Sequence, residues 1–334
     1  MKIEQSEELQ KLIKTIFSIG TEKEFKSAAI ALFKLQFKHN SVYRKYCKLL
    51  GKGEKEVKQL KDIPFLPIQF FKHQEVKTGD FTAELVFKSS GTGGARSVHH
   101  VKEKRLYEQS FLQNFSALYG PLQDLTILAL LPSYLEQGES SLIYMCDRLI
   151  QATKSPESGF YLHNYSELVS QMAALADQNR RVLLIGVSYA LLDLVEQHQL
   201  PRHPKLRVME TGGMKGRRKE LIREELHHKL SEGFGQDHIH SEYGMTELLS
   251  QAYSKGHGIF QYPPWMKVLI RNQEDPFSYV NDGQYGGINV IDLANIDSCA
   301  FIQTDDLGRG KKGKFEVLGR FDNSELRGCN LLIA

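Results

Sequence analysis

Short apolar runs alternate with amphipathic segments through the middle of the sequence, and no other feature restricts the fold as much. The apolar runs that we interpret as strands are residues 83–87, 125–131, 182–187 and 206–213. Between and after them, apolar residues recur at helical spacing over residues 104–120, 165–179 and 218–234. Because strands that alternate with helices form parallel β-α-β units, we expect an α/β fold with a sheet covered by helices on both faces.

The pattern changes on either side of this core. Up to about residue 58, apolar positions at three- and four-residue spacing predict several helices, and the proline-containing aromatic stretch 62–72 predicts an extended connector. Beyond about residue 253, short strands with glycine turns replace the helical spacing. We therefore divide the chain into an N-terminal helical region (about 1–80), an α/β core (about 81–252), a smaller β-rich subdomain (about 253–320) and a short tail (321–334).

Composition narrows the classes of partner and location. With 41% hydrophobic residues, 25% charged residues and a formal net charge of +3, the chain belongs to the soluble globular class and has no overall charge excess that would suit nucleic acid. It has no run of about 18 uncharged apolar residues, so we expect no membrane-spanning helix. The first residues lack the apolar stretch of a secretory signal, and the four cysteines form no Cys-x-x-Cys pair, which favours reduced thiols in the cytoplasm.

The stretch "KSSGTGGARS", Lys88 to Ser97, follows the first apolar run. We predict a strand, a glycine-rich turn and then a helix from about Glu103. Glycines allow backbone N–H groups to converge on an anion, and serine and threonine hydroxyls add donors, so the turn is a candidate phosphate cradle. The spacing of a Walker loop is missing. A turn in which glycine and serine serve only the backbone remains the alternative.

A second polar group lies in "HIHSEYGMTELLSQAY". Tyr243, Gly244, Thr246 and Glu247 follow a predicted strand, and an aromatic ring, a hydroxyl and a carboxylate suit a purine, a phosphate and Mg²⁺ respectively. The alternative is an ordinary helix start, with Thr246 and Glu247 in the first turn.

Acidic and basic residues also follow the predicted strands near the C-terminus. Asp305 and Asp306 lie behind one strand, and Arg320 and Asp322 behind the next. Acidic groups at strand ends commonly hold ribose hydroxyls, and arginine offers a forked cation for phosphate. Two β-turns would explain the same residues.

The order of these motifs along the chain favours the functional interpretation of each over the purely structural one. "SSGTGG", "YGMTE", "TDDLG" and "GRFDNSELRG" follow one another at wide separations, and this series resembles the signature motifs of the acyl-adenylate-forming superfamily. The resemblance runs from about residue 84 to residue 328. The N-terminal helical region and "IPFLPIQFFK" are similar to the branch that contains phenylacetate-CoA ligases and the acyl-protein synthetases of bacterial luminescence, and the short C-terminus favours the acyl-protein synthetases.

The resemblance implies the layered α/β fold of an adenylating domain over residues 1–320 and a set of roles for the motif residues. It implies attack of a carboxylate, which we expect to be a fatty acid, on the α-phosphate of ATP, to give acyl-AMP and pyrophosphate with Mg²⁺ as the metal. Thr246 would contact the α-phosphate, Glu247 would bind Mg²⁺, and Arg320 would assist at the ribose. The nucleotide-binding residues implied are Ser89, Ser90, Gly91, Thr92, Gly93 and Gly94 at the phosphates, Gly212, Gly213, Tyr243 and Gly244 around the adenine, and Asp306 at the ribose.

The sequence departs from the family pattern at two points. The family loop usually ends in Pro-Lys, whereas Arg96 and Ser97 occupy those places here, so Arg96 is our candidate catalytic cation. Relatives continue for about a hundred residues into a mobile lid domain with a catalytic lysine, and we expect this lid to be absent. Arg96, Lys215 and Arg217 are the candidates to replace its lysine.

A cysteine near the C-terminus indicates the second half-reaction. Cys329 follows the glycine that closes the last motif, and acyl-protein synthetases carry their acyl group on a cysteine near the C-terminus. A thiol there could attack acyl-AMP and become a thioester for an acyl-CoA-reductase-like partner. We interpret Cys47, Cys146 and Cys299 as structural.

Three other functions compete with this interpretation. The chain could pass the acyl group to CoA, as phenylacetate-CoA ligases do, with Cys329 incidental. "GVSYA" resembles the nucleophile elbow of a serine hydrolase, with Ser188 as nucleophile and a histidine as base. A nucleotide-binding scaffold without catalysis is the third. The candidate bases are His198, His203, His227 and His228.

Overall fold

The structure is a computed structural model of the chain, and it describes residues 7–90, 94–131, 139–213, 218–219, 221–311 and 313–321. Within these ranges, twelve strands form one sheet in the order β11-β12-β13-β14-β10-β9-β8-β7-β6-β4-β5, with β1 attached to β13. β2 and β3 form a separate two-stranded sheet. The strands are β1 (Leu66–Pro67), β2 (Leu85–Lys88), β3 (Val98–Val101), β4 (Thr126–Leu130), β5 (Gly159–Tyr161), β6 (Val182–Val187), β7 (Leu206–Thr211), β8 (His240–Tyr243), β9 (Ala252–Ser254), β10 (Ile259–Gln261), β11 (Met266–Arg271), β12 (Tyr285–Asp292), β13 (Phe301–Lys311) and β14 (Lys314–Arg320).

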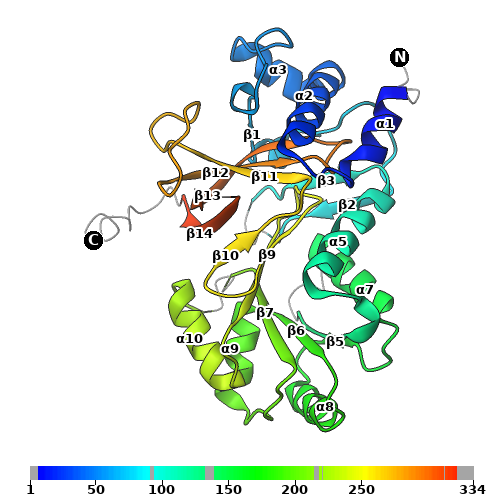
Figure 1. Cartoon of the computed structure of the whole chain (residues 1–334), viewed down its shortest axis with the longest axis vertical. Helices are drawn as coiled ribbons and strands as arrows, with labels where there is room; N and C mark the ends of the chain where they lie inside the picture. The colour runs from blue at the N-terminus through cyan, green and yellow to red at the C-terminus, as the bar shows by residue number, and fades with distance from the viewer. Residues whose placement is uncertain are drawn as a thin grey trace.

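Helices cover both faces of the sheet, as the sequence predicts. In Figure 1, α5 and α7 flank strands β6 and β7 on one side and α9 and α10 on the other, while α1, α2 and α3 form a separate group near the N-terminus. The described helices are α1 (Glu7–Ile16), α2 (Glu22–His39), α3 (Ser41–Leu49), α4 (Phe70–His73), α5 (Lys104–Tyr119), α7 (Ser141–Thr153), α8 (Tyr165–Asp177), α9 (Ser188–Gln197) and α10 (Arg223–Phe234), with short 3₁₀ turns η1 (Leu60–Asp62) and η2 (Leu122–Asp124).

The parallel part of the sheet follows the predicted β-α-β pattern. β5, β4, β6, β7 and β8 pair in parallel, and β6 is buried along its whole length. Beyond β8 the pairing becomes antiparallel, and β9, β10 and β14 continue the same sheet. The apolar runs therefore predict a doubly covered sheet correctly, because a strand covered on both faces must be apolar throughout.

The first predicted strand is the exception, because β2 does not join this sheet. It pairs antiparallel with β3, a strand that the sequence pattern did not reveal, and α5 begins only after β3. The helix predicted from about Glu103 is confirmed, because α5 begins at Lys104, but the sequence analysis missed β3: the glycine-rich stretch connects two strands of a hairpin. The four residues of β3, "VHHV", are too few for an alternating pattern to be distinguished from a loop.

Two glycines of β12 allow a long side chain to cross the sheet at the end that carries the acidic residues. A Cβ on Gly286 would lie 2.0 Å from the Arg271 carbonyl oxygen, and one on Gly287 would lie 2.2 Å from Arg271 Cζ. The buried Arg271 guanidinium donates to the carbonyl oxygens of Ile288 and Thr304, at 2.8 Å each. A larger residue at Gly287 would displace this cation, and one at Gly286 would clash with the Arg271 backbone.

Candidate functional site

The base of the glycine-rich hairpin is closed by hydrogen bonds. Ser89 N donates to Ser97 O, and Ser97 N donates to Ser89 Oγ, at 3.0 Å each. Arg96 Nε donates to Ser89 O, and its Nη2 lies 3.4 Å from Lys88 O. Arg96, our candidate cation, is therefore engaged with the loop's own carbonyl groups. Gly94 is exposed with φ of +101°, a conformation that favours glycine, while Gly91, Thr92 and Gly93 lie outside the described residues.

Thr246 and Glu247 lie in a turn after β8, and no helix begins there. The alternative interpretation as a helix start is therefore wrong. Glu247 is 4% exposed, and burial raises the pKa of its carboxyl. The neighbouring Ser97 side chain lowers this pKa by a smaller amount. Because Ser97 also closes the hairpin, the glycine-rich loop and the turn are joined directly.

Buried polar side chains that the sequence analysis missed hold this turn. His99 Nδ1 lies 2.7 Å from Thr246 O, and Asn295 Nδ2 donates to Glu247 O at 2.8 Å. The Asp292 carboxylate accepts from Leu249 N, Ser250 N and Ser250 Oγ at 2.6 to 2.9 Å. No local signal could have revealed these contacts, since the partners come from β3, from the end of β12 and from the turn that follows β12.

Asp306 on β13, Arg320 on β14 and Tyr243 on β8 meet at one place. The Tyr243 hydroxyl donates to Asp306 Oδ2 at 2.7 Å, and Arg320 Nε lies 3.3 Å from Asp306 Oδ1. Asp306 is opposite Arg320 in the β13–β14 register, and β13 continues through Asp305 and Asp306. These aspartates therefore belong to a strand, which excludes the β-turn interpretation for them. Arg320 is the last residue of β14, and its side chain is 75% exposed, while Asp322 lies outside the described residues.

The Tyr243 ring is enclosed by two phenylalanines. It lies edge-on to Phe315, with ring centroids 5.4 Å apart, and close to Phe260 at 5.9 Å. Burial and the neighbouring Asp306 carboxylate raise the pKa of the Tyr243 hydroxyl well above its usual range. The hydroxyl is therefore a fixed hydrogen-bond donor to Asp306.

Gly212 and Gly213 are exposed residues directly after β7. Gly212 has φ of +66°, and its carbonyl oxygen accepts from Ser188 Oγ at 2.9 Å. The Ser188 hydroxyl also lies 3.3 Å from Glu210 Oε2. Gly212 and Gly213 are thus placed by a contact from the start of α9.

A carboxyl group that the sequence analysis missed lies beside Gly244. Glu242 Oε1 lies so close that a Cβ on Gly244 would be 2.3 Å from it, and the Thr211 hydroxyl donates to Glu242 Oε2 at 2.6 Å. Burial raises the pKa of Glu242 to about 7, and the neighbouring Glu210 carboxylate adds to the rise. A side chain at position 244 would therefore clash with the Glu242 carboxyl, so this motif position requires glycine.

The surroundings of Ser188 do not suit a nucleophile. Ser188 is 2% exposed and its hydroxyl donates to oxygen atoms. His227 Nε2 lies 3.5 Å from Glu210 Oε1, whereas Ser188 Oγ contacts the other oxygen of the same carboxylate directly. A catalytic triad needs the histidine between the serine and the acid, so this order disfavours the hydrolase alternative.

The described cysteines are inert. Cys47, Cys146 and Cys299 are buried, and burial raises the pKa of each thiol, that of Cys47 to about 12. Cys329, Lys215 and Arg217 lie outside the described residues. Across the described part of the chain, no three metal-ligating side chains cluster, and none of the helices combines the length and apolar character that crossing a bilayer requires.

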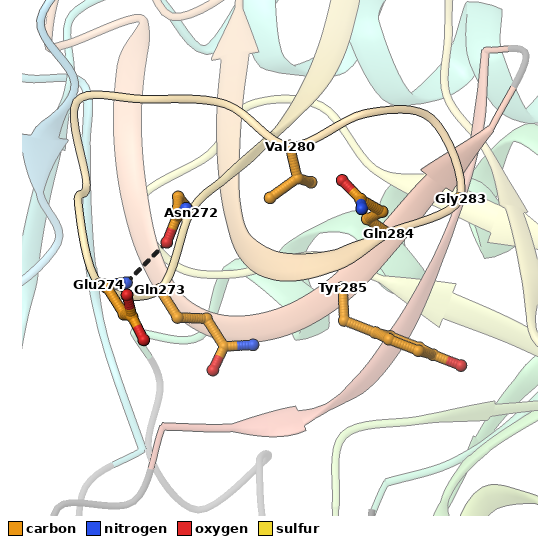
Figure 2. A pocket seen from close by; sticks show the side chains of 7 residues that line it. All are labelled: Asn272, Gln273, Glu274, Val280, Gly283, Gln284 and Tyr285. Atoms are coloured by element: carbon orange, nitrogen blue, oxygen red, sulfur yellow. Dashed lines mark hydrogen bonds between the residues drawn. The ribbon is translucent and has the colours of Figure 1, made fainter. Parts of the chain in front are cut away.

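A hollow lies away from the predicted site. Figure 2 shows it in the loops between β11 and β12, with Asn272, Gln284 and Tyr285 among its lining residues and a volume of about 610 Å³. A hollow of about 220 Å³ lies between β2 and α7, lined by Phe87 and Tyr144 among others. Neither is lined by a residue that the motifs predict.

Comparison with known proteins agrees with the motifs. The model of the family "Acyl-protein synthetase, LuxE" matches residues 17–117. The long-chain-fatty-acid–luciferin-component ligase of Vibrio harveyi is 25% identical over 342 residues, which cover 94% of this chain and 89% of that protein. The ligase of the same name from Aliivibrio fischeri is 23% identical, over 95% of this chain and 90% of its own length.

Solved structures share the fold. A 2-hydroxyisobutyryl-CoA ligase in complex with 2-HIB-AMP and CoA superposes with a TM-score of 0.64 at 14% identity, over 93% of this chain and 71% of that chain. ATP-bound MatB from Rhodopseudomonas palustris gives a TM-score of 0.54 at 16% identity, over 72% of this chain and 49% of that chain. The predicted fold of the acyl-adenylate-forming enzymes and the resemblance to the acyl-protein synthetases are both confirmed.

Proposed function

We propose that this chain, a ligase that matches the LuxE family of acyl-protein synthetases, activates a carboxylic acid with ATP as an acyl-AMP and then transfers the acyl group to its own Cys329. The observation that carries the proposal is the convergence of three motifs distant in sequence. His99, just past the base of the glycine-rich hairpin, contacts the Thr246 carbonyl oxygen at 2.7 Å. The Tyr243 hydroxyl bonds to Asp306, which Arg320 also contacts.

In this proposal the nucleotide lies across the three motifs. The glycine-rich loop surrounds the phosphates, Asp306 accepts the ribose hydroxyls, and the largely exposed Arg320 is available to ribose or phosphate. The adenine lies against Tyr243 and the exposed Gly212 and Gly213. Supporting this arrangement, Tyr243 and Arg320 already fix the Asp306 carboxylate from two sides.

Mg²⁺ fits beside Glu247. This buried carboxyl makes no ion pair within 4.0 Å with any residue in the described ranges, and burial raises its pKa. A divalent cation would offset that cost, and oxygen ligands of this kind suit Mg²⁺. When bound, the ion would neutralise phosphate charge, while Thr246 and the glycine-rich loop orient the phosphates.

The first step needs positioning and charge neutralisation more than covalent catalysis. A carboxylate oxygen of the acid attacks the α-phosphorus, a P–O bond forms, and the bond to pyrophosphate breaks. We expect Thr246 to contact the α-phosphate and Arg96 to support the loop, since its guanidinium holds the loop carbonyls. Long-chain fatty acids are the substrate class suggested by the names of the two relatives.

In the second step the Cys329 thiolate attacks the acyl carbonyl carbon, a thioester forms, and AMP leaves. The buried states of Cys47, Cys146 and Cys299 support the choice of Cys329, because a thiol with a raised pKa is a poor nucleophile at neutral pH. The thioester would then pass to a partner protein of the acyl-CoA-reductase kind.

The test is incubation of the protein with ATP, Mg²⁺ and radiolabelled fatty acid, followed by treatment with neutral hydroxylamine, which cleaves thioesters. Cys329→Ser should keep fatty-acid-dependent ATP–pyrophosphate exchange and lose the protein-bound label, whereas Cys47→Ser should keep both. Label that persists in Cys329→Ser would exclude this cysteine as acceptor. Label found only on added CoA would support the CoA-ligase alternative, and no exchange in the wild type would refute the adenylation step.

A further inference from the structure

Ser97, directly before β3, and His99, within β3, lie against the turn after β8. Ser97 and His99 are alternate residues, so their side chains point to the same side of the chain, and they are 2% and 1% exposed. The Ser97 hydroxyl is a neighbour of the Glu247 carboxyl and lowers its pKa, and His99 Nδ1 lies 2.7 Å from the Thr246 carbonyl oxygen. The strand that closes the glycine-rich hairpin therefore also determines where Thr246 and Glu247 lie.

Asn295 completes the arrangement from a third segment. Its Nδ2 donates to Glu247 O at 2.8 Å and to Cys299 O at 2.9 Å, and its Oδ1 lies 3.1 Å from His99 Nε2. Asn295 is 1% exposed. The carbonyl groups of Thr246 and Glu247 are thus each held by a side chain distant in sequence.

The hydrogen-bond geometry assigns the proton on His99. A carbonyl oxygen can only accept, so Nδ1 must carry the hydrogen that points to Thr246. Burial lowers the pKa of His99 to about 4, and the hydrogen bonds to Thr246 and Asn295 act against this shift. The Nδ1 contact, at 2.7 Å, is the shorter of the ring's two polar contacts and the one that reaches the turn directly.

We propose that His99 is a positioning residue for adenylation: its Nδ1–H holds the Thr246–Glu247 turn in register with the glycine-rich loop, so that both act on the same triphosphate. This inference rests on the proposed function. A neutral imidazole that is completely buried costs desolvation energy that an apolar residue would avoid, and a displacement of about 1 Å near reacting groups can reduce the rate about 100-fold.

The test uses side chains that reproduce one ring nitrogen at a time. The Asn amide nitrogen can occupy the place of Nδ1, and the Gln amide nitrogen the place of Nε2. The variants are His99→Asn, His99→Gln and His99→Phe, and the matched control is His100→Gln, because His100 is the next residue of β3 and is only partly buried. Measurements are kcat and the KM for fatty acid in ATP–pyrophosphate exchange, the thermal midpoint, and its rise with MgATP.

We expect His99→Phe and His99→Gln to lose at least tenfold in kcat, with the KM for fatty acid within about twofold of wild type. His99→Asn should stay within about threefold, and His100→Gln should match the wild type. Wild-type rates in His99→Phe, or equal losses in His99→Asn and His99→Gln, would overturn the positioning role. If His99→Phe does not fold, comparing the kcat of His99→Asn with that of His99→Gln tests the positioning role.

Failure of the proposed function is distinguishable from failure of this inference. A wild type that neither exchanges pyrophosphate nor gains thermal stability with MgATP would overturn both. A wild type that exchanges while all His99 variants exchange equally well would overturn the positioning role alone. A wild type that gains stability with MgATP but does not exchange would refute adenylation. The positioning role would then fail with it.

Discussion

Replacement of Glu242 by Gln should change the pH dependence of stability. Burial, with a smaller contribution from the Glu210 carboxylate, raises the pKa of Glu242 from 4.5 to about 7, so the folded state prefers the protonated carboxyl. The unfolded chain releases this proton near pH 4.5, whereas the folded chain retains it up to about pH 7. The stability that the protonated group contributes is therefore complete below pH 4.5 and is lost as the pH rises through 7.

The magnitude follows from the pKa. Each tenfold change in proton affinity is worth about 1.4 kcal/mol, so the full effect is about 3 kcal/mol, most of it developed between pH 5 and pH 8. Gln has the size of protonated Glu and keeps an oxygen for the Thr211 hydroxyl, but it cannot ionise. Relative to wild type, Glu242→Gln should gain about 2 kcal/mol in free energy of unfolding when the pH is raised from 5 to 8.

Urea unfolding at both pH values, followed through the fluorescence of the single tryptophan Trp265, measures this difference, because Trp265 is only 2% exposed and reports on the core. Glu54→Gln is the matched control, because Glu54 is exposed and the substitution makes the same chemical change. If Glu242→Gln and wild type differ by the same free energy at pH 5 and pH 8, Glu242 does not retain a proton in the folded state and the reasoning is refuted.

Two further substitutions test the ribose contact and the hydrolase alternative. Asp306→Asn keeps an acceptor for Tyr243 but removes the charge opposite Arg320, so the KM for ATP in pyrophosphate exchange should rise about tenfold with the KM for fatty acid unchanged. An unaltered KM for ATP would exclude the ribose role of Asp306. Ser188→Ala removes a buried hydroxyl that donates to Gly212 and should lower the free energy of unfolding by about 1 kcal/mol in a denaturant titration, with exchange kcat within about twofold. ATP-independent esterase activity that disappears in this variant would instead support the hydrolase.

The motifs identify the candidate residues but not the elements that carry them. "SSGTGG" was predicted before a helix and lies between two strands, because β3 is too short for its alternation to show. In "YGMTE", Tyr243 ends β8, and Thr246 and Glu247 lie in a turn where the sequence also allowed a helix start. "TDD" lies within a strand where the sequence also allowed a β-turn. The candidate residues are the same in each case, because the chemistry of their side chains does not depend on which element carries the motif.

The sequence by itself determined the covered parallel sheet and the three motif segments. A strand buried on two faces must be apolar along its length, and the spacing within a motif is short-range, so both can be recognised from neighbouring residues. Only the tertiary structure decided that His99 and Asn295 hold the Thr246–Glu247 turn, that Glu242 lies against Gly244, and that burial sets the pKa of both Glu242 and His99. The physical reason is that a hydrogen bond between distant segments and the desolvation of an ionisable group depend on what the folded chain brings together. Neighbouring residues in the sequence do not encode either quantity.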